Sequence, residues 1–244
     1  GIFDLATRLY GITFKEVNNI PLYHPEVKTY EVYDNDGSFL AVLYTDFFPR
    51  ESKGGGAWMT QFRGQKMIDG KDQRPLVSLV MNFTKPTDTK PSLLTFNEVT
   101  TFLHEFGHAL HGMFSKCTYG STSMDGVSRD FVELPSQFME NFALEKEWLD
   151  TWAVHYQTGE KIPQEYIDKI KKSSNFQAGY ASDRQLSFGM VDMAWHTITE
   201  PVTEPLVDFE QRAMGKTEIM PLVKGSAFSP AFGHIFAGGY AAGY

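Results

Sequence analysis

The 244-residue sequence predicts an α+β fold in which helices predominate. Between residues 29 and 83, four runs rich in β-branched and aromatic side chains are separated by turn signals, which favours a small sheet. Beyond Pro91 the spacing of the apolar residues becomes helical. Because strands come first and helices follow, we expect an antiparallel or mixed sheet beside a bundle of helices.

The first 90 residues are expected to contain one helix and the small sheet. Residues 2–16 fit a short helix. Residues 34–37 read Asp-Asn-Asp-Gly, a turn signal that predicts a hairpin between the runs on either side. The expected strands are residues 29–33, 39–48, 57–62 and 76–83, of which the last should be well buried.

Residues 91–244 are expected to be mainly helical. Residues 95–98 match the capping-box pattern, with Thr at the first position and Glu at the fourth, and predict a helix that ends near Phe114. A polar loop should follow over 115–129. Pro135 suits the first turn of the next helix. The later helices are expected over 133–146, 147–157, 163–173 and 177–199.

The charge and composition exclude several kinds of partner. The net charge is −8, so the chain lacks the excess of basic residues that nucleic acids and anionic membranes attract. No run reaches the roughly 18 apolar residues of a membrane span. The single cysteine, Cys117, excludes an internal disulfide framework and a multi-cysteine zinc site. A reducing compartment, the cytoplasm, is therefore the expected location.

Residues 104–108 read His-Glu-Phe-Gly-His in the middle of the first long helix. On a helix, His104 and His108 share one face with Cβ atoms about 5–6 Å apart, so both imidazoles can bind one zinc ion. Glu105 lies in the same turn, where its carboxylate can take a proton from water. The pattern is typical of zinc hydrolases. The competing interpretation is a helical scaffold whose histidines belong to the core.

A catalytic zinc ion needs a third protein ligand and an open position. A metzincin-type extension requires Gly at 111 and His at 114, but the sequence has His111 and Phe114. His111 lies about 10 Å along the helix from His104, which leaves it a substrate-side group or a polar residue near the helix end. The remaining route is a carboxylate from the following segment: Asp125, Asp130, Glu133 or Glu140.

Glu133 is the preferred third ligand. Apolar residues flank it on both sides, so its charge implies a strong partner such as a cation. Glu140 lies on the same helical stripe and suits a hydrogen bond to the other nitrogen of a ligating histidine, a role for which Asp130 competes. The alternative for Glu133 is a carboxylate stabilised by the dipole at a helix start.

Two segments together resemble the thimet oligopeptidase family of zinc metallopeptidases. They are residues 104–111, His-Glu-Phe-Gly-His-Ala-Leu-His, and 131–137, Phe-Val-Glu-Leu-Pro-Ser-Gln. Within the family the resemblance is closest to the bacterial peptidyl-dipeptidase and oligopeptidase A branch, and it extends from Gly11 to Tyr240. It implies a peptidase for short peptide substrates, expected to be monomeric, with one Zn²⁺ ion. The implied ligands and base are His104, His108, Glu133 and Glu105.

The resemblance also implies roles near the end of the sequence. Residues 232–234 and 238–244 match the mobile Gly-rich loop of the family. Its His234, Tyr240 and Tyr244 would donate hydrogen bonds to the substrate or to the tetrahedral oxyanion. A phenol hydroxyl can stabilise a developing oxyanion, and glycines allow such a loop to close.

The family continues beyond both ends of this sequence, with a long helical region before Gly1 and further aromatics and helices after Tyr244. We therefore expect residues 1–244 to be the zincin-like catalytic region of a larger, two-lobed helical peptidase. Residues 1–90 would supply a helix and the sheet, and residues 91–244 would supply the helical metal-binding and substrate-loop part.

Zincins generally present a strand edge to an extended substrate. Residues 54–62 are the candidate, with Gly55, Gly56 and Ala57 against the substrate, because glycines allow close backbone approach. A plain loop followed by a buried strand is the alternative.

The expected reaction is zinc-dependent hydrolysis of short oligopeptides with release of C-terminal dipeptides. Internal cleavage, as in an oligopeptidase A-like endopeptidase, stays open. So does a non-catalytic fragment that binds zinc or peptide. Arg129 or Arg184 could anchor a substrate carboxylate, although each is more often a structural or surface cation.

Overall fold

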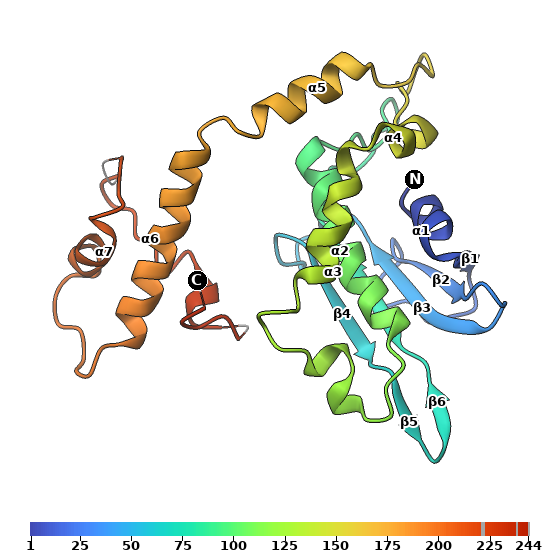
Figure 1. Cartoon of the computed structure of the whole chain (residues 1–244), viewed down its shortest axis with the longest axis horizontal. Coiled ribbons are helices and arrows are strands. Elements are labelled where there is room, and N and C mark those ends of the chain that lie inside the picture. The colour runs from blue at the N-terminus through green and yellow to red at the C-terminus, as the bar shows by residue number, and fades with distance from the viewer. Residues whose placement is uncertain (221–222, 238, 244) are drawn as a thin grey trace. The chain divides into compact units, whose positions relative to one another are not determined.

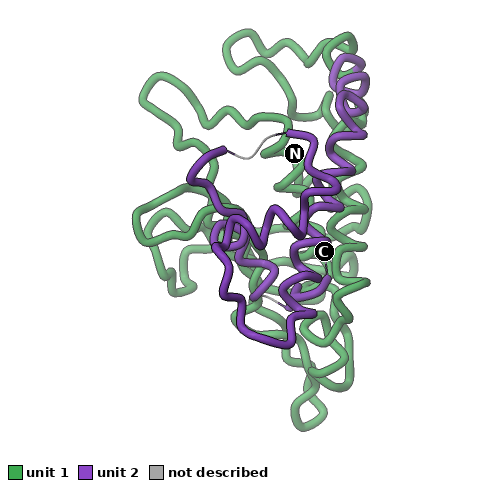
Figure 2. The backbone as a smooth tube through the Cα atoms, turned by 90° about the vertical axis from the view of Figure 1, so that its left-hand side faces the viewer, with its two compact units in different colours: residues 1–167 green, residues 168–244 purple. Residues whose placement is uncertain are grey.

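The structure, a computed structural model, describes residues 1–220, 223–237 and 239–243. It separates into two compact units, Gly1–Ile167 and Asp168–Tyr244, which Figure 2 shows in different colours. The boundary falls within helix α5 (Gln164–Ser173). The expected metal ligands all lie in the first unit, and the expected Gly-rich loop lies in the second.

A five-stranded mixed sheet forms the base of the first unit, with strand order β1-β2-β3-β7-β4 (Figure 1). β3 and β7 are parallel, and the three other pairs are antiparallel. β7 thus lies between β3 and β4, and β4 is an edge strand. The strands are β1 (Thr13–Val17), β2 (Lys28–Tyr33), β3 (Phe39–Asp46), β4 (Trp58–Arg63) and β7 (Leu76–Val80).

Helix α2 (Phe96–Phe114) packs on one face of this sheet. Its buried Leu103 and Phe106 join Leu43 and Leu79 of the sheet in one core cluster. Burial of apolar surface contributes roughly 25 cal/mol per Å², and this holds α2 against the strands. The core thereby fixes the helix that carries residues 104–108.

The first helix is shorter than the sequence predicts. α1 covers Ile2–Tyr10, where a helix over 2–16 is expected. Gly11 ends it in the left-handed conformation, with φ of 77°, and its N–H donates to the Thr7 carbonyl. Such a glycine is a frequent helix terminator. The following residues then pair with β2 as strand β1, an interaction that local periodicity does not reveal.

A two-stranded ribbon is missing from the sequence-based prediction. β5 (Lys66–Ile68) and β6 (Lys71–Gln73) pair antiparallel through Asp69 and Gly70. These two residues have φ of 48° and 74°. Positive φ at both positions is typical of a type I′ hairpin turn, for which Asp-Gly is a favoured sequence. The turn signal is present, but three-residue strands give no readable alternation.

The helices after α2 follow the expected order with different bounds. α3 (Leu134–Glu140) continues only into a 3-10 turn, Asn141–Leu144, because Glu145 is extended with φ of −78° and ψ of 110°. α6 (Ala178–His196) falls within the helix expected over 177–199. α4 (Lys146–Trp152) begins one residue before the helix expected over 147–157 and ends five residues earlier, and α7 (Leu206–Met214) is additional. None of the described helices is long and apolar enough to cross a membrane.

The second unit is organised around α6 and α7. The Trp195 ring on α6 lies 4.2 Å from the Phe209 ring on α7. Phe188 stacks on Phe228 at a centroid distance of 4.7 Å. Aromatic pairs of this kind add about 1 kcal/mol beyond area burial. The first pair joins α6 to α7, and the second attaches the segment that begins at residue 228 to α6.

Candidate metal centre

Helix α2 presents the two histidines to the same space. Thr95 accepts a hydrogen bond from the Glu98 N–H at 3.2 Å, and the Glu98 side chain accepts from the Thr95 N–H at 2.7 Å. The predicted capping box is therefore formed and sets the start of α2. One turn separates His104 from His108, and their ring centroids lie 4.9 Å apart.

Glu133, the N-cap residue of α3, completes a cluster of three possible ligands. Its Oε2 lies 3.2 Å from Nε2 of His104 and 3.1 Å from Nε2 of His108. The three ligand atoms lie within 4.8 Å of one another. Within the described residues this is the one set of three or more His, Cys, Asp or Glu side chains that meets the geometry for a metal ion. All three residues are partly exposed, so solvent reaches the site.

Gly107 allows α3 to approach α2 closely enough for this contact. A Cβ atom at position 107 would lie 2.4 Å from the Pro135 carbonyl oxygen and 2.6 Å from the Ser136 Cα. Distances this short are not tolerated between non-bonded atoms, so only glycine fits where the helices cross. The absence of a side chain at Gly107 therefore allows Glu133 to come close to the two histidines.

Two further side chains orient the cluster. Oε1 of Glu140, the last residue of α3, lies 2.6 Å from Nδ1 of His104. The Ser136 hydroxyl donates to Oε2 of Glu133 at 2.8 Å and lies 3.0 Å from its backbone carbonyl oxygen. Sequence reasoning identifies Glu140 as a partner of a ligating histidine but misses Ser136. Its position three residues after Glu133, in the first helical turn, is a signal that could have identified it.

Glu105 is more buried than the three possible ligands His104, His108 and Glu133. The residue is buried, with 8% exposed surface. Burial raises the pKa of Glu105, and the nearby charge of Glu133 adds to this rise, whereas His104 and the Met59 backbone oppose it. A carboxylate with a raised pKa holds a proton more readily, as a general base must during turnover.

Burial lowers the pKa of both His108 and His111. Their neutral forms are therefore favoured, and a neutral imidazole is the form that binds metal. The Nδ1 atoms of both rings are buried and have no hydrogen-bond partner among the described residues. His111 lies on α2 outside the three-ligand cluster, so its part at the site stays a prediction.

The segment expected to meet the substrate leads into the edge strand β4. The Asn82 side chain donates to the carbonyl oxygens of Gly54 and Gly56, at 2.9 and 2.8 Å. Gly56 has φ of 83°, a conformation that favours glycine. Ala57 follows and is partly buried. Among the described strands β4 pairs only with β7, so it is an edge strand, and the part of these residues in substrate binding stays a prediction.

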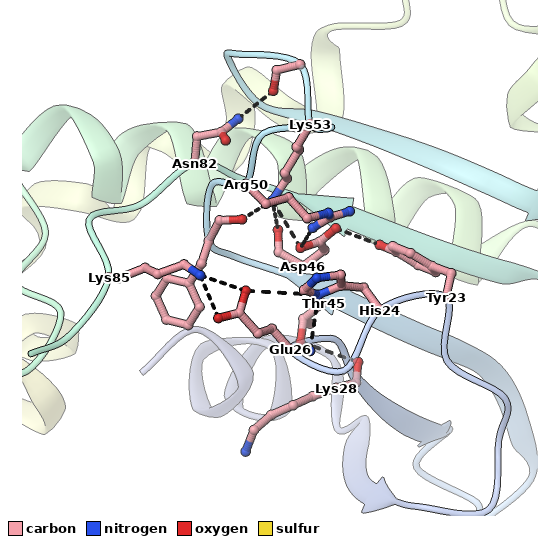
Figure 3. A network of polar contacts seen from close by, with 12 residues as sticks. Tyr23, His24, Glu26, Lys28, Thr45, Asp46, Arg50, Lys53, Asn82 and Lys85 are labelled. Atoms are coloured by element: carbon pink, nitrogen blue, oxygen red, sulfur yellow. Dashed lines mark hydrogen bonds and ion pairs between the residues drawn. The ribbon is translucent and has the colours of Figure 1, made fainter.

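A buried ion pair holds the loop that precedes these glycines (Figure 3). Lys53 donates to Asp46 Oδ1 at 3.1 Å and to the Asp46 and Phe48 carbonyl oxygens at 2.9 Å each. Arg50 and the Tyr23 hydroxyl also donate to Asp46, at 2.9 and 3.0 Å. Burial opposes ionisation of Asp46, but these donors outweigh it and lower its pKa. The network fixes the chain between β3 and Gly54.

The other candidate carboxylates lie elsewhere. Asp125 accepts a hydrogen bond from Gln61 of β4 at 2.7 Å. Asp130 is exposed, and within the described chain His104 Nδ1 has Glu140 as its carboxylate contact. Of the two arginines, Arg184 lies on α6 with its guanidinium 4.6 Å from the Phe188 ring centroid, and Arg129 lies in the loop before α3.

The residues expected in the Gly-rich loop fall in the second unit. His234 lies in a 3-10 turn, Gly233–Ile235, and its ring centroid is 5.2 Å from that of Tyr240 in an edge-to-face contact. Tyr244 lies outside the described residues. Their action on a substrate stays a prediction.

The donor set of the cluster suits a zinc ion. Two imidazole nitrogens and one carboxylate oxygen are the protein ligands of one common type of catalytic zinc site, which leaves a fourth position open. Here the three atoms converge from two helices, and Glu140 and Ser136 hold two of the three side chains in place. Glu105 adds a buried carboxylate from the same turn. A metal-assisted hydrolysis is the chemistry that this set can perform.

The whole chain, residues 1–244, matches the family model described as Peptidase family M3. The chain is 43% identical to the dipeptidyl carboxypeptidase of Salmonella typhimurium, 42% identical to oligopeptidase A of Escherichia coli and 36% identical to the thimet-like oligopeptidase of Dictyostelium discoideum. Each match covers 100% of this chain and 36%, 36% and 37% of the respective relative. The chain thus spans about a third of the length of these proteins.

Proposed function

Because the chain belongs to peptidase family M3, we propose that it supplies the zinc centre of an enzyme that hydrolyses peptide bonds in short oligopeptides. The observation that carries this proposal is the approach of Glu133 Oε2 to within 3.2 and 3.1 Å of the two Nε2 atoms on α2. Residues 1–244 would form one zincin-like catalytic region of a larger, two-lobed helical protein.

His104, His108 and Glu133 would hold one zinc ion. Bound zinc would lower the pKa of a water molecule and polarise the carbonyl of the scissile bond. Glu140 would accept a hydrogen bond from Nδ1–H of His104, which would leave Nε2 free to act as a ligand. Ser136 orients the Glu133 carboxylate through its hydroxyl group.

Glu105 would act as the general base and acid. It takes a proton from the attacking water and returns it to the leaving amine. Its burial favours the protonated form that this return requires. His234, Tyr240 and Tyr244 would donate hydrogen bonds to the substrate or to the oxyanion, as the family resemblance implies.

The substrate would lie extended along β4, with Gly55, Gly56 and Ala57 beside it. The edge position of β4 supports this, because an unpaired edge offers backbone N–H and C=O groups to an added strand. His111, on α2, would lie on the substrate side of the metal.

A zinc and activity assay on the full-length protein tests the proposal. After dialysis against zinc, mass spectrometry should find one zinc ion per chain, and a chelator should abolish cleavage of a fluorogenic peptide. A protein that stays metal-free would support the scaffold interpretation instead. One that binds zinc but cleaves no peptide would be a non-catalytic binding module.

We propose the release of C-terminal dipeptides as the reaction, with internal cleavage as the alternative. Relatives of both names, dipeptidyl carboxypeptidase and oligopeptidase A, are similar to this chain. Product analysis on peptides with free and with amidated C-termini distinguishes the two reactions. An enzyme that releases C-terminal dipeptides should cleave the free peptide but not the amidated one. A monomer in the cytoplasm is the expected state, which light scattering and cell fractionation would test.

A further inference from the structure

The turn that follows Tyr240 has a backbone conformation that its residues disfavour. The Gly243 N–H donates to the Tyr240 carbonyl oxygen at 2.8 Å, which closes a turn over Ala241 and Ala242. Ala242 has φ of 55°, in the left-handed region. For a residue with a Cβ atom this region is unfavourable, so something outside the turn must stabilise it.

The stabilising group is a fully buried carboxylate on α6. Oδ1 of Asp192 accepts a hydrogen bond from the Ala242 N–H at 2.9 Å, and the Asp192 side chain has 0% exposed surface. The same oxygen lies 3.0 Å from Nδ1 of His196. A buried carboxylate forms strong hydrogen bonds with backbone N–H groups, because these bonds replace the water that burial removes. The bond from Ala242 thus offsets the strain at Ala242.

A second buried carboxylate attaches the other end of the same segment. Glu210 on α7, with 1% exposed surface, accepts hydrogen bonds from the backbone N–H groups of Phe228 and Ser229 at 2.8 and 2.6 Å. The Trp195 indole donates to the Ser229 hydroxyl at 2.8 Å. The segment from 228 to 243 is therefore attached to α6 and α7 at both ends, and His234 and Tyr240 lie between the attachments.

We propose that Asp192 is a positioning residue for Tyr240. By holding the Tyr240–Gly243 turn in its strained form, the carboxylate sets the direction in which the Tyr240 hydroxyl points. The consequence for catalysis rests on the proposed function, in which that hydroxyl stabilises the oxyanion. The attachment itself does not depend on that function.

A merely structural role for Asp192 makes a different prediction. If the carboxylate only stabilised the second unit, relief of strain at residue 242 would restore nothing. If the Asp192 carboxylate offsets the strain at Ala242, then Ala242→Gly should restore part of the activity that is lost when the carboxylate is removed. Glycine adopts positive φ without penalty, so the turn would no longer need the carboxylate. The double-mutant combination therefore separates the two roles.

The test compares five variants of the full-length protein with the wild type. Asp192→Leu removes the acceptor at similar size, and Asp192→Asn keeps one carbonyl oxygen that can accept the Ala242 N–H. Ala242→Gly is made alone and in the Asp192→Leu background. Asp208→Leu, at an exposed carboxylate on α7, is the matched control. The two readouts are hydrogen exchange over residues 239–243 and kcat on a fluorogenic peptide.

We expect Asp192→Leu to speed exchange over 239–243 and to lower kcat by about tenfold with KM little changed, since a displaced hydrogen-bond donor acts on the transition state. Asp192→Asn should stay within about threefold of the wild type, and Ala242→Gly should recover at least about threefold in the Asp192→Leu background. Asp208→Leu should change neither readout.

Unchanged exchange over 239–243 in Asp192→Leu would overturn the proposal. A loss of kcat that Ala242→Gly does not reduce would also overturn it. So would a loss of kcat that a lowered melting temperature explains as a loss of folded protein. If the wild type cleaves no peptide, the proposed function fails, whereas the exchange measurement still decides whether Asp192 holds the turn.

Discussion

Nδ1 of His104 lies 2.6 Å from Oε1 of Glu140, while Nε2 of the same ring lies 3.2 Å from Oε2 of Glu133. Glu133 lies at the start of α3 and Glu140 at its end. His104 is therefore held between two carboxylates. Glu133 can bind the same metal ion, and Glu140 can accept a hydrogen bond from the other ring nitrogen. With a metal ion bound at Nε2, this arrangement would favour the tautomer in which Nδ1 carries the proton.

Replacement of this proton acceptor should weaken zinc binding. We expect Glu140→Gln to lower zinc affinity by roughly 10- to 100-fold, because His104 loses both its orientation and part of its basicity. Competitive titration with a chromophoric chelator measures this. Asp130→Asn is the control, since Asp130 was the rival for this role; an equal loss in both variants would contradict the assignment to Glu140.

Loss of the proposed base should separate metal binding from turnover. Glu105→Gln keeps the size of the side chain and removes its basicity, so the protein should still bind one zinc ion while kcat falls by about 10² or more. Zinc content and peptide hydrolysis are measured on the same preparation. Rates near those of the wild type would show that another group takes the proton.

A methyl group at the crossing of α2 and α3 should push the helices apart. Gly107→Ala places a Cβ atom 2.4 Å from the Pro135 carbonyl oxygen, and we expect the free energy of unfolding to fall by roughly 3 kcal/mol. Zinc affinity should fall with it, because Glu133 moves away from both rings. Chemical denaturation and zinc titration measure the two effects.

Gly179→Ala provides the comparison for this variant. Gly179 is also helical, and a Cβ atom there would meet nothing within 4 Å. This substitution should leave zinc affinity unchanged and stabilise the protein by up to about 1 kcal/mol, because alanine favours a helix more than glycine does. Similar losses at both positions would refute the steric explanation.

The ion pair of Asp46 with Lys53 and Arg50, at the end of β3, should make the free energy of unfolding depend on pH. The donors around Asp46 lower its pKa below the usual 3.8, so its ionised form stabilises the folded state above pH 3.8. This contribution is lost as the pH falls through the lower, folded-state pKa. Asp46→Asn should cost about 3 kcal/mol at neutral pH, because Lys53 and Arg50 lose their counter-charge.

The difference between wild type and Asp46→Asn should shrink as the pH falls below 3.8, which denaturation at several pH values can follow. Lys85→Gln is the comparison, since its ion pair with Glu26 is exposed and should contribute little to stability at any of these pH values. A constant difference at all pH values would contradict the assignment to Asp46.

Much of the metal-binding part of the first unit could be predicted because its signals are local. The capping box fixed the start of α2, and the four-residue spacing placed His104 and His108 on one face. The prediction of Glu133 as the third ligand needed an argument beyond periodicity. An unpaired charge among apolar neighbours is costly, so the carboxylate implied a cationic partner.

What failed depended on contacts distant in the sequence. β1 exists because it pairs with β2, and residues 13–16 read equally well as the end of a helix. The crossing at Gly107 depends on the backbone of residues 135 and 136, which the sequence of α2 alone does not contain. The contact of Asp192 with Ala242 spans 50 residues and has no pattern of its own.

The strand order carries a consequence for how the chain is synthesised. β4 leaves the ribosome before β7, yet β7 is its partner and separates it from β3. Until residue 80 has emerged, β4 has no place in the sheet, and pairing between distant segments is slow. The β4 edge of the sheet is thus among its last parts to form.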